Sequence, residues 1–336
     1  MKAYKVIDGG GLENLKIHDA SLQDPEENQV KIKWHATTLN YHDYLVAIGA
    51  IKVEEGRIPM SDGAGEVVEL GAGVTRFKKG DKVMSLFFPN WVEGRPTLSK
   101  IKAISGESVD GYMCEYSCLN ENTLTLMPQG MSYAEAACLP TAGLTAWNAL
   151  FENGNIGLGD SVLIEGTGGM SLCAAIFARH AGVDIYGTTS SEEKAKKLVD
   201  WGFKSVVNYK KDENWGKSIY KIAGGVDQVI DVGGGSTMKQ SIEACKLGGH
   251  IHSIGILGAG RKGEITFPKL FFKFIKLEGL AVGSRKMQED MVKAIESQGI
   301  DFSNLVDRRF AFSELKAAFE YQAQGKHMGK IVIEYR

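Results

Sequence analysis

The first part of the chain alternates apolar and polar side chains over short stretches, and this pattern predicts β-strands. In residues 30–36 (VKIKWHA), apolar side chains alternate with lysine and histidine, and a period of two is typical of a half-buried strand. Two further apolar runs, GAGEVVELGAG and FKKGDKVMSLF, are bounded by glycine turns. Strands of this length and spacing predict a small barrel or sandwich. Residues 88–110 show no period, and we expect an extended loop there with one helical turn.

The pattern changes near Pro128. Residues 132–151 are predicted to be helical around a break at Pro140. Beyond them, predicted strands (SVLIEG, VDIYGTT, KSVVNY, VDQVIDVGG, HIHSIGI and KLEGLAVGS) alternate with helical stretches such as GMSLCAAIFARHAG. This alternation predicts a parallel, doubly wound sheet of the α/β class. Two more helices and a last strand, KIVIEYR, follow.

The composition changes this picture little. A chain of 336 residues suits two domains, and a hydrophobic content of 43% excludes bulk disorder. The net charge of -2 gives no reason to expect nucleic acid or an anionic membrane as a partner. No apolar run reaches the roughly 18 residues of a membrane span, and the start MKAYKVIDGG lacks the apolar segment of a signal peptide. Five cysteines, an odd number, favour reduced thiols and a cytoplasmic location.

The sharpest motif is VLIEGTGGMS, residues 162–171, in which a strand runs into a glycine turn and then a helix. Gly166 allows a sharp turn, and Gly168 and Gly169 allow the backbone to approach a pyrophosphate at the positive end of the helix. Ser171 stands where a third glycine is usual. A glycine motif of this kind is weak by itself, but the strand before it and the helix after it indicate a dinucleotide site.

The end of the next predicted strand bears on the choice of cofactor, because an acid there usually binds the ribose 2'-hydroxyl of NAD. Here the turn contains Thr189 and Ser190 with Lys194 behind them, and the two glutamates that follow already belong to a helix. Ser190 and Glu193 have the spacing of a capping box. Hydroxyl groups and a cation suit a 2'-phosphate, so we expect NADP rather than NAD.

The chain resembles the medium-chain dehydrogenase/reductase superfamily, in particular its zinc-independent branch of quinone oxidoreductases and zinc-less alcohol dehydrogenase-like proteins. The resemblance covers essentially the whole chain. Its marks are ATTLNYHDY (36–44), SDGAGEVVELGAGV (61–74), GDKV (80–83), LPTAGLTAW (139–147), GTGGMS (166–171), NY (208–209) and HMGKIVI (327–333). It implies a GroES-like β-barrel catalytic domain, residues 1–127 and 285–336, around an inserted Rossmann domain, residues 128–284.

The resemblance also implies the site residues. The zinc-ligand positions of the alcohol dehydrogenases are Asn40, Ser61 and Thr141 here, and none is a good zinc ligand, so no metal is expected. Asn40, Tyr41 and Tyr44 are the candidate donors to the developing oxyanion, that is, the candidate catalytic residues. The expected cofactor-binding residues are Asn40, Thr141, Thr145, Thr167, Gly168, Gly169, Met170, Thr189, Ser190, Lys194, Tyr209, Gly233, Ile254, Gly255, Ser284, Arg285 and Lys330.

These features predict an NADPH-dependent, zinc-independent oxidoreductase that transfers hydride to a quinone, an enone, or an aldehyde or ketone. One alternative is an NAD(P)-dependent alcohol dehydrogenase whose metal is displaced toward His42, Asp43 and Asp62. Another, of a different class, is a non-enzymatic nucleotide-binding structural protein. A methyltransferase is disfavoured because the ribose of its nucleoside cofactor also requires an acid after the second strand, and the turn at Thr189 has none. The sixth strand is expected at a sheet edge, where members of the resembling family commonly pair as homodimers.

Overall fold

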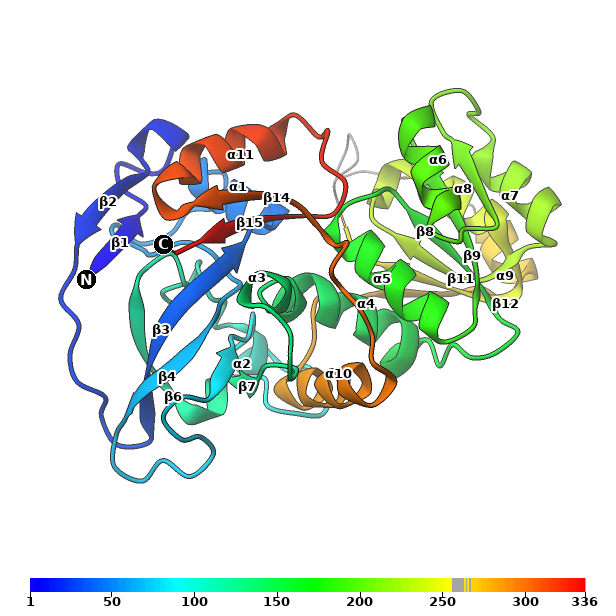
Figure 1. Ribbon diagram of the computed structural model, residues 1–336. Helices are drawn as coiled ribbons and strands as arrows, with labels where there is room; N and C mark the ends of the chain where they lie inside the picture. Colours follow the sequence, from blue (N-terminus) through cyan, green and yellow to red (C-terminus); the bar gives the residue numbers. More distant parts are fainter. Residues whose placement is uncertain (256–262, 264, 266, 336) are drawn as a thin grey trace. The chain divides into compact units, whose positions relative to one another are not determined.

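The computed structural model describes residues 1–255, 263, 265 and 267–335 (Figure 1). Its chain divides into two compact units. Unit 1 comprises Met1–Leu144 and Val282–Arg336, and unit 2 comprises Thr145–Ala281. The boundaries from the sequence lie after residues 127 and 284, so the structure assigns residues 128–144 and 282–284 to unit 1 instead.

Unit 1 is built on a seven-stranded sheet in the order β14-β15-β3-β4-β5-β7, with β6 paired to β3. These strands are β3 (Gln29–Thr38), β4 (Ala64–Leu70), β5 (Lys82–Met84), β6 (Tyr116–Asn120), β7 (Thr125–Leu126), β14 (Val306–Ala311) and β15 (Lys330–Glu334). A separate antiparallel pair is formed by β1 (Lys2–Lys5) and β2 (Lys16–Asp19). Because β15 pairs with β3, residues near the two ends of the chain complete one sheet.

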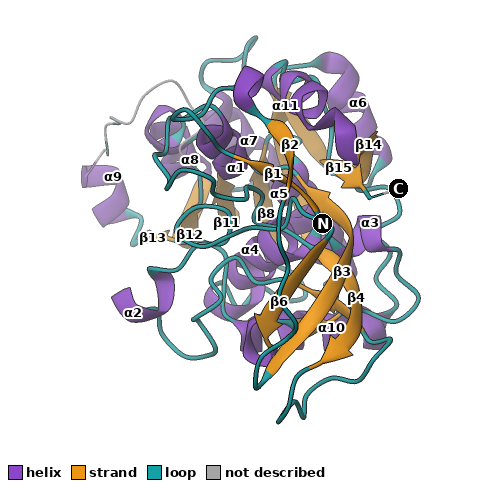
Figure 2. Ribbon diagram, turned by 90° about the vertical axis from the view of Figure 1, so that its left-hand side faces the viewer, coloured by secondary structure: helices purple, strands orange, loops and turns teal. Residues whose placement is uncertain are grey.

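The alternation that predicted the first long strand is confirmed in β3. Val30, Ile32 and Trp34 are buried in the core of unit 1, and Lys33 between them is exposed. Figure 2 shows β3 beside β4 and β6, the two strands with which it pairs. The predicted loop of residues 88–110 holds one short helix, α2 (Leu98–Ile101), as expected.

The other helices of unit 1 are α1 (Tyr41–Ala47), α3 (Tyr133–Ala136), α10 (Arg285–Gln298) and α11 (Leu315–Ala323), and α4 (Leu144–Trp147) joins the two units. Pro140 lies in a π-helical turn, Leu139–Gly143, that separates α3 from α4, so the predicted break is confirmed. Strand β14 was not predicted from the sequence. Its exposed, charged residues give no apolar alternation, and its place is set by pairing with β15.

Unit 2 is a six-stranded, all-parallel sheet in the order β10-β9-β8-β11-β12-β13. The strands are β8 (Ser161–Glu165), β9 (Asp184–Thr189), β10 (Ser205–Asn208), β11 (Val226–Asp231), β12 (Cys245–Ser253) and β13 (Lys276–Gly279). The helices are α5 (Gly169–His180), α6 (Glu192–Asp200), α7 (Trp215–Ala223), α8 (Met238–Ala244) and α9 (Phe267–Phe272). In this doubly wound order the direction of winding reverses between β8 and β11, and ligands bind at that point beside the carboxyl ends of the strands.

The predicted cap at the start of helix α6 is wrong. Helix α6 begins at Glu192 and its N-cap is Ser191, whose Oγ accepts a hydrogen bond from the Lys194 backbone N–H at 3.3 Å. Ser190 lies one residue before the cap, and the Glu193 carboxylate binds Lys197 at 2.7 Å. The capping box expected between Ser190 and Glu193 is therefore absent.

Candidate active site

The centre of the polar site in unit 1 is the carboxylate of Asp62, which is completely buried. Its Oδ2 accepts hydrogen bonds from Thr38 Oγ1 at 2.6 Å and from Asn40 Nδ2 at 2.8 Å. Its Oδ1 accepts one from Thr141 Oγ1 at 2.6 Å. Residues from β3, α1 and the turn after α3 therefore converge on one carboxylate.

Lys330, the first residue of β15, supplies the positive charge. Its side chain is only 3% exposed, and its Nζ lies 3.3 Å from Asp62 Oδ2. The same ammonium group donates to Asn40 Oδ1 at 2.7 Å and to the Leu39 carbonyl at 3.0 Å. An ammonium group has three N–H donors, so three protein acceptors account for all of them.

The start of α1 fixes the position of Asn40. Asp43 Oδ2 accepts a hydrogen bond from the Asn40 backbone N–H at 2.9 Å, which satisfies a donor at the start of the helix. Its other oxygen accepts the Ser61 backbone N–H, also at 2.9 Å. Asn40 Nδ2 in turn lies 3.2 Å from Ser61 Oγ. Asp43 thus holds the segment before β4 against Asn40, the N-cap of α1.

His42 lies next to this site and pairs with acids on both sides of its ring. Its Nε2 is 2.7 Å from Glu107 Oε2, and its Nδ1 is 3.6 Å from Asp43 Oδ1. Burial alone would lower the pKa of His42, but the hydrogen bonds and charges of Asp43 and Glu107 outweigh it and raise that pKa. His42 is therefore paired with the carboxylates of Asp43 and Glu107.

Asn40 and Thr141, expected beside the cofactor, are thus brought together at Asp62, a residue that the sequence singled out only for a displaced metal. Tyr41 and Tyr44 lie outside the network. Tyr44 packs against Phe319, with ring centroids 6.1 Å apart, and forms part of the wall of the unit 1 core. Tyr41 is 44% exposed.

Zinc does not fit this site. Asn40, Ser61 and Thr141 offer amide and hydroxyl groups where zinc prefers thiolate, imidazole or carboxylate. The nearest carboxylate, that of Asp62, already accepts from Thr38, Asn40 and Thr141 and pairs with the Lys330 ammonium. Within residues 1–255, 263, 265 and 267–335, no group of three or more His, Cys, Asp and Glu side chains could hold a metal ion.

The glycine motif of unit 2 has the geometry of an anion site. Gly166 follows β8 with a φ of +75°, in the region that favours glycine. Gly168 is the N-cap of the 12-residue helix α5, and a Cβ added there would meet no atom within 4 Å. As glycine it carries no capping side chain, so the first N–H groups of α5 are open to an anionic ligand. A dinucleotide pyrophosphate fits this cradle.

Ser171 shows how the motif tolerates the loss of its third glycine. The side chain is buried, and its Oγ donates to the Glu165 carbonyl at 2.8 Å. The hydroxyl therefore bonds helix α5 to the end of β8 instead of holding them apart. Thr167 beside it is also buried, whereas Gly169 and Met170 are partly exposed at the start of the helix.

The end of β9 contains Thr189, which is buried, and Ser190, which is half-buried. Tyr209 follows β10, is 43% exposed, and donates its backbone N–H to the Thr189 carbonyl at 3.0 Å. Glu192 is the first residue of α6. It accepts from Asn208 Nδ2 at 2.7 Å and pairs with Lys211 at 3.0 Å, and these contacts lower its pKa. Its charge is thus matched by Lys211, and Lys194 lies in the first turn of the same helix.

Three expected residues lie at the ends of the next strands. Gly233 follows β11, and Ile254 and Gly255 follow β12. A Cβ on Gly255 would come within 2.3 Å of the Val232 carbonyl oxygen, so glycine is required where the two segments touch. The Ile254 N–H donates to the Asp231 carbonyl at 2.9 Å.

Of the remaining expected residues, Ser284 and Arg285 have contacts within unit 1. Ser284 is the N-cap of α10 and accepts from the Met287 N–H at 3.3 Å. Arg285 binds Asn122 Oδ1 at 2.7 Å. Thr145 is buried in α4. The Ser284 and Arg285 contacts involve neither the glycine motif nor Asp62.

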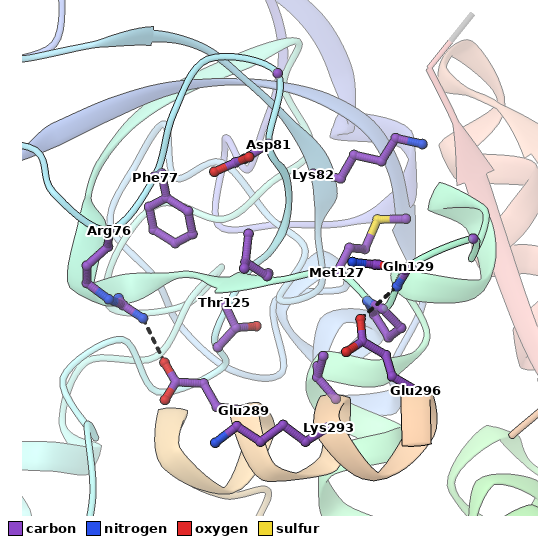
Figure 3. A pocket seen from close by; sticks show the side chains of 15 residues that line it. Arg76, Phe77, Asp81, Lys82, Thr125, Met127, Gln129, Glu289, Lys293 and Glu296 are labelled. Carbon is purple, nitrogen blue, oxygen red and sulfur yellow. Dashed lines mark hydrogen bonds and ion pairs between the residues drawn. The ribbon is translucent and has the colours of Figure 1, made fainter. Parts of the chain in front are cut away.

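A separate cavity of about 680 Å³ lies in unit 1 against α10 (Figure 3). It is lined by residues of β5, β7 and α10, among them Lys82 and Lys293, and by Phe77 and Met127 in the adjoining loops. Its charged groups are largely engaged: Arg76 pairs with Glu289 at 2.7 Å, and Glu296 accepts the Gln129 N–H at 2.9 Å. None of the site residues expected from the sequence lines this cavity.

Two family models match the chain. The alcohol dehydrogenase GroES-like domain matches residues 26–129, and the zinc-binding dehydrogenase model matches residues 169–297. No helix within the described part of the chain is long and apolar enough to cross a membrane.

Relatives match over most of the chain. The zinc-type alcohol dehydrogenase-like protein C1773.06c of Schizosaccharomyces pombe is 35% identical, over 96% of each chain. The 2-methylene-furan-3-one reductase of Solanum lycopersicum is 29% identical, over 99% of this chain and 79% of its own length. Quinone oxidoreductase of Rattus norvegicus is 29% identical, over 77% of this chain and 74% of its own. Among solved structures, a putative alcohol dehydrogenase from Sinorhizobium meliloti superposes with a TM-score of 0.91, at 32% identity, over 99% of this chain and 98% of its own.

Proposed function

The chain belongs to the medium-chain dehydrogenase/reductase superfamily and is an NAD(P)H-dependent oxidoreductase, and from this premise we propose that it is a zinc-independent reductase that uses NADPH to reduce conjugated carbonyl compounds, enones or quinones. The observation that carries the proposal is the Asp62 site. Asn40, Ser61 and Thr141 stand where zinc ligands would be, and the Lys330 ammonium already neutralises the carboxylate between them.

The donor groups around Asp62 do not suit zinc, and this narrows the proposed substrate class. Reduction of a simple aldehyde or ketone places a full negative charge on one oxygen, which a metal or a strong donor must stabilise. Reduction of an enone or a quinone spreads that charge over a conjugated system, and solvent can supply the proton. The tomato and rat relatives bear names of this substrate class. We therefore favour enones and quinones over simple aldehydes and ketones.

NADPH would supply the hydride, and the chain's own residues would bind and orient it. The N–H groups at the start of α5 suit the pyrophosphate. The proposed contacts of the adenosine 2'-phosphate are Thr189, Ser190, Lys194 and Tyr209. Lys194 carries positive charge, and the two acids of the first turn of α6, Glu192 and Glu193, are paired with Lys211 and Lys197. Asn40 and Thr141 are proposed to contact the nicotinamide ribose. Lys330 is proposed to orient Asn40 instead of contacting the cofactor, because its three donors are engaged.

We also propose a homodimer. Strand β13 is at an edge of the unit 2 sheet, and an unpaired edge strand presents backbone groups that a second chain can satisfy. Next to it in sequence, Phe267, Phe271 and Phe272 of α9 are each about 70% exposed. Pairing of β13 with its twin would be an isologous contact that continues the sheet.

The alternative alcohol dehydrogenase with a displaced metal has little support. Asp43 accepts two backbone N–H groups, Asp62 is paired with Lys330, and His42 is paired with Glu107. Each of these proposed ligands already has a protein partner that a metal would have to displace. The non-enzymatic alternative is set aside by the oxidoreductase relatives that match over most of the chain.

Turnover of a substrate panel tests the proposal. The purified protein is assayed with quinones, enones and simple aldehydes, each with NADPH and with NADH. We expect turnover of the conjugated substrates, faster with NADPH. Turnover of simple alcohols and aldehydes alone, or an equal preference for NADH, would contradict it.

A further inference from the structure

Two buried carboxyl groups lie side by side beneath the glycine motif of unit 2. Glu165 is the last residue of β8 and directly precedes Gly166, and Asp231 is the last residue of β11. The two strands are neighbours in the sheet. Glu165 is 3% exposed and Asp231 is completely buried. The pair therefore occupies the point where the winding of the sheet reverses, at the carboxyl ends of the strands.

The hydroxyl of Ser241, in α8, bridges the pair. Its Oγ lies 2.8 Å from Glu165 Oε1 and 2.7 Å from Asp231 Oδ2. Both distances are those of O–H···O hydrogen bonds. A serine hydroxyl has one proton and can donate to only one of the two oxygens. The second bond needs a second proton, and a protonated carboxyl group can supply it.

The other contacts indicate which carboxyl group carries this proton. Asp231 accepts the Gly234 N–H at 2.7 Å and the Thr237 hydroxyl at about 2.9 Å, in addition to Ser241. Glu165 accepts the Val232 N–H at the longer distance of 3.3 Å, and the Gly233 N–H acts on both carboxyl groups. More donors favour the ionised form, so Asp231 is the carboxylate and Glu165 is the acid. Glu165 then donates to Ser241, and Ser241 donates to Asp231.

The electrostatic surroundings agree with one proton on the pair. Burial, and then the charge of Asp231, raise the pKa of Glu165 well above its usual value. Burial also raises the pKa of Asp231, although Ser241, Gly234 and Thr237 counter it. Glu165 lies between β9, where it is aligned with Thr188, and β11, with α8 packed against them. Of these elements, Asp231 is the titratable group that acts on Glu165, and neither carboxyl group forms an ion pair within the described residues.

The pair is bonded to the loops on which the cofactor would lie. The Glu165 carbonyl accepts from Ser171 in the glycine motif, and its side chain accepts from Val232 in the loop after β11. Asp231 holds Gly234 and Thr237 of the same loop, and its carbonyl accepts the Ile254 N–H after β12. A change of charge on the pair would act on three loops at once.

We propose that Glu165 and Asp231 hold one shared proton through Ser241 and act as positioning residues for the dinucleotide, so that cofactor binding is linked to retention of that proton. The positioning role rests on the proposed dinucleotide site, because loss of the proton would add a negative charge beneath an anionic ligand. The shared proton itself is independent of any ligand.

The presence of the shared proton is tested on the protein without cofactor. The infrared spectrum of the wild-type protein in D₂O at neutral pH should contain the band of a buried protonated carboxyl group. The band should be absent from Glu165→Gln and remain in Glu121→Gln, which alters another buried glutamate, in unit 1, that accepts the backbone N–H groups of Thr75 and Arg76. A wild-type spectrum without the band, or a band that survives in Glu165→Gln, would overturn the shared proton.

The linkage is tested by calorimetric titration with NADPH across the pH range in which the infrared band is monitored. Wild-type affinity should stay constant while the band persists and weaken on the order of tenfold when the band is lost. Glu165→Gln keeps a neutral donor to Ser241 and has no proton to lose there, so its affinity should show no such loss across the pH range. Ser241→Ala should weaken binding on the order of tenfold at neutral pH, whereas Ser218→Ala, which removes a serine hydroxyl bound to Asp212, should not.

The outcomes separate the two claims. If the wild-type protein binds neither NADPH nor NADH, the proposed function fails while the infrared result still decides the shared proton. If the cofactor binds and wild type and Glu165→Gln share the same pH dependence, or Ser241→Ala binds as wild type, the positioning role is wrong and the proposed function stands.

Discussion

Lys330 and Asp62, which are 268 positions apart in the chain, form an ion pair of 3.3 Å that is almost completely shielded from solvent. Burying two charges carries a desolvation cost, which is offset only when the remaining donors and acceptors are satisfied. Here Asn40 Oδ1 and the Leu39 carbonyl accept the other two hydrogen bonds of the Lys330 ammonium group. The Asp62 carboxylate accepts further hydrogen bonds from Thr38, Asn40 and Thr141. The pair therefore gives the side chains around Asp62 a fixed geometry.

Removing one partner of this pair should be costly. Lys330→Met leaves the Asp62 carboxylate buried without its cation, and we expect the free energy of unfolding to fall by about 3–5 kcal/mol. Adding Asp62→Asn should recover part of that loss, because no unpaired charge then remains. Urea unfolding of both variants measures this. Lys316→Met, which breaks a surface pair with Glu13, serves as control and should change stability by less than about 1 kcal/mol. Equal effects of the two lysine substitutions would contradict the prediction.

Lys194 should decide between the two cofactors. Lys194→Ala removes a positive charge that suits the 2'-phosphate, so NADPH binding should weaken by about ten- to a hundredfold, as expected for a charge-assisted hydrogen bond of roughly 1.5–3 kcal/mol. NADH binding should be nearly unchanged. Titration calorimetry with both cofactors checks this. Lys197→Ala on the same helix, where Lys197 pairs with Glu193, is the matched control. Equal weakening of both cofactors by Lys194→Ala would refute the assignment.

Activity should not depend on a metal. Asn40, Ser61 and Thr141 are poor zinc ligands, and Asp62 is occupied by Lys330. Dialysis against a strong chelator should leave the turnover number unchanged, and elemental analysis should find less than one zinc per chain. Stoichiometric zinc that is lost together with activity would show that the zinc-independent interpretation is wrong.

His252 should make the protein sensitive to acid. Its side chain is completely buried on β12, and burial, together with the neighbouring charges of His250 and Lys276, lowers its pKa from 6.5 to about 3. Below pH 6.5 the unfolded chain binds a proton that the folded chain does not. The free energy of unfolding should therefore fall as the pH drops from 6.5 toward 3, with a slope approaching about 1.4 kcal/mol per pH unit from this group.

The His252 contribution can be isolated by substitution. His252→Gln replaces a titrating side chain with a neutral one, and urea unfolding should show a shallower decline of stability across this pH range. His180→Gln, at an exposed position near the end of α5, should leave the decline as in wild type. An unchanged pH profile in His252→Gln would assign the acid sensitivity to other groups.

Association should follow from the exposed edge of the unit 2 sheet. Light scattering at micromolar concentration should give a mass of about 73 kDa, twice the 36.6 kDa chain. Phe271→Glu with Phe272→Glu places charges on the exposed face of α9 and should shift the mass toward the monomer if that face borders the interface. A stable wild-type monomer at this concentration would refute edge pairing and leave the cofactor proposals intact.

Much of the architecture is a local property of the sequence. The period of two in residues 30–36 predicted β3, because alternate side chains of a strand face the core. The glycine motif predicted the turn between β8 and α5, because Gly166 adopts a positive φ that other residues disfavour. Each signal lies within one element or turn, so neighbouring residues contain all that is needed to read it.

Contacts between distant segments were decided only by the tertiary structure. The sequence suggested Asn40, Thr141 and Lys330 through a family resemblance, but their common partner Asp62 and the engagement of all three Lys330 donors depend on how β3, β15 and the turn after α3 meet. The Glu165–Ser241–Asp231 bridge likewise joins three elements. Such networks depend on distances of a few ångströms between residues far apart in the chain, and no periodicity or motif encodes those distances.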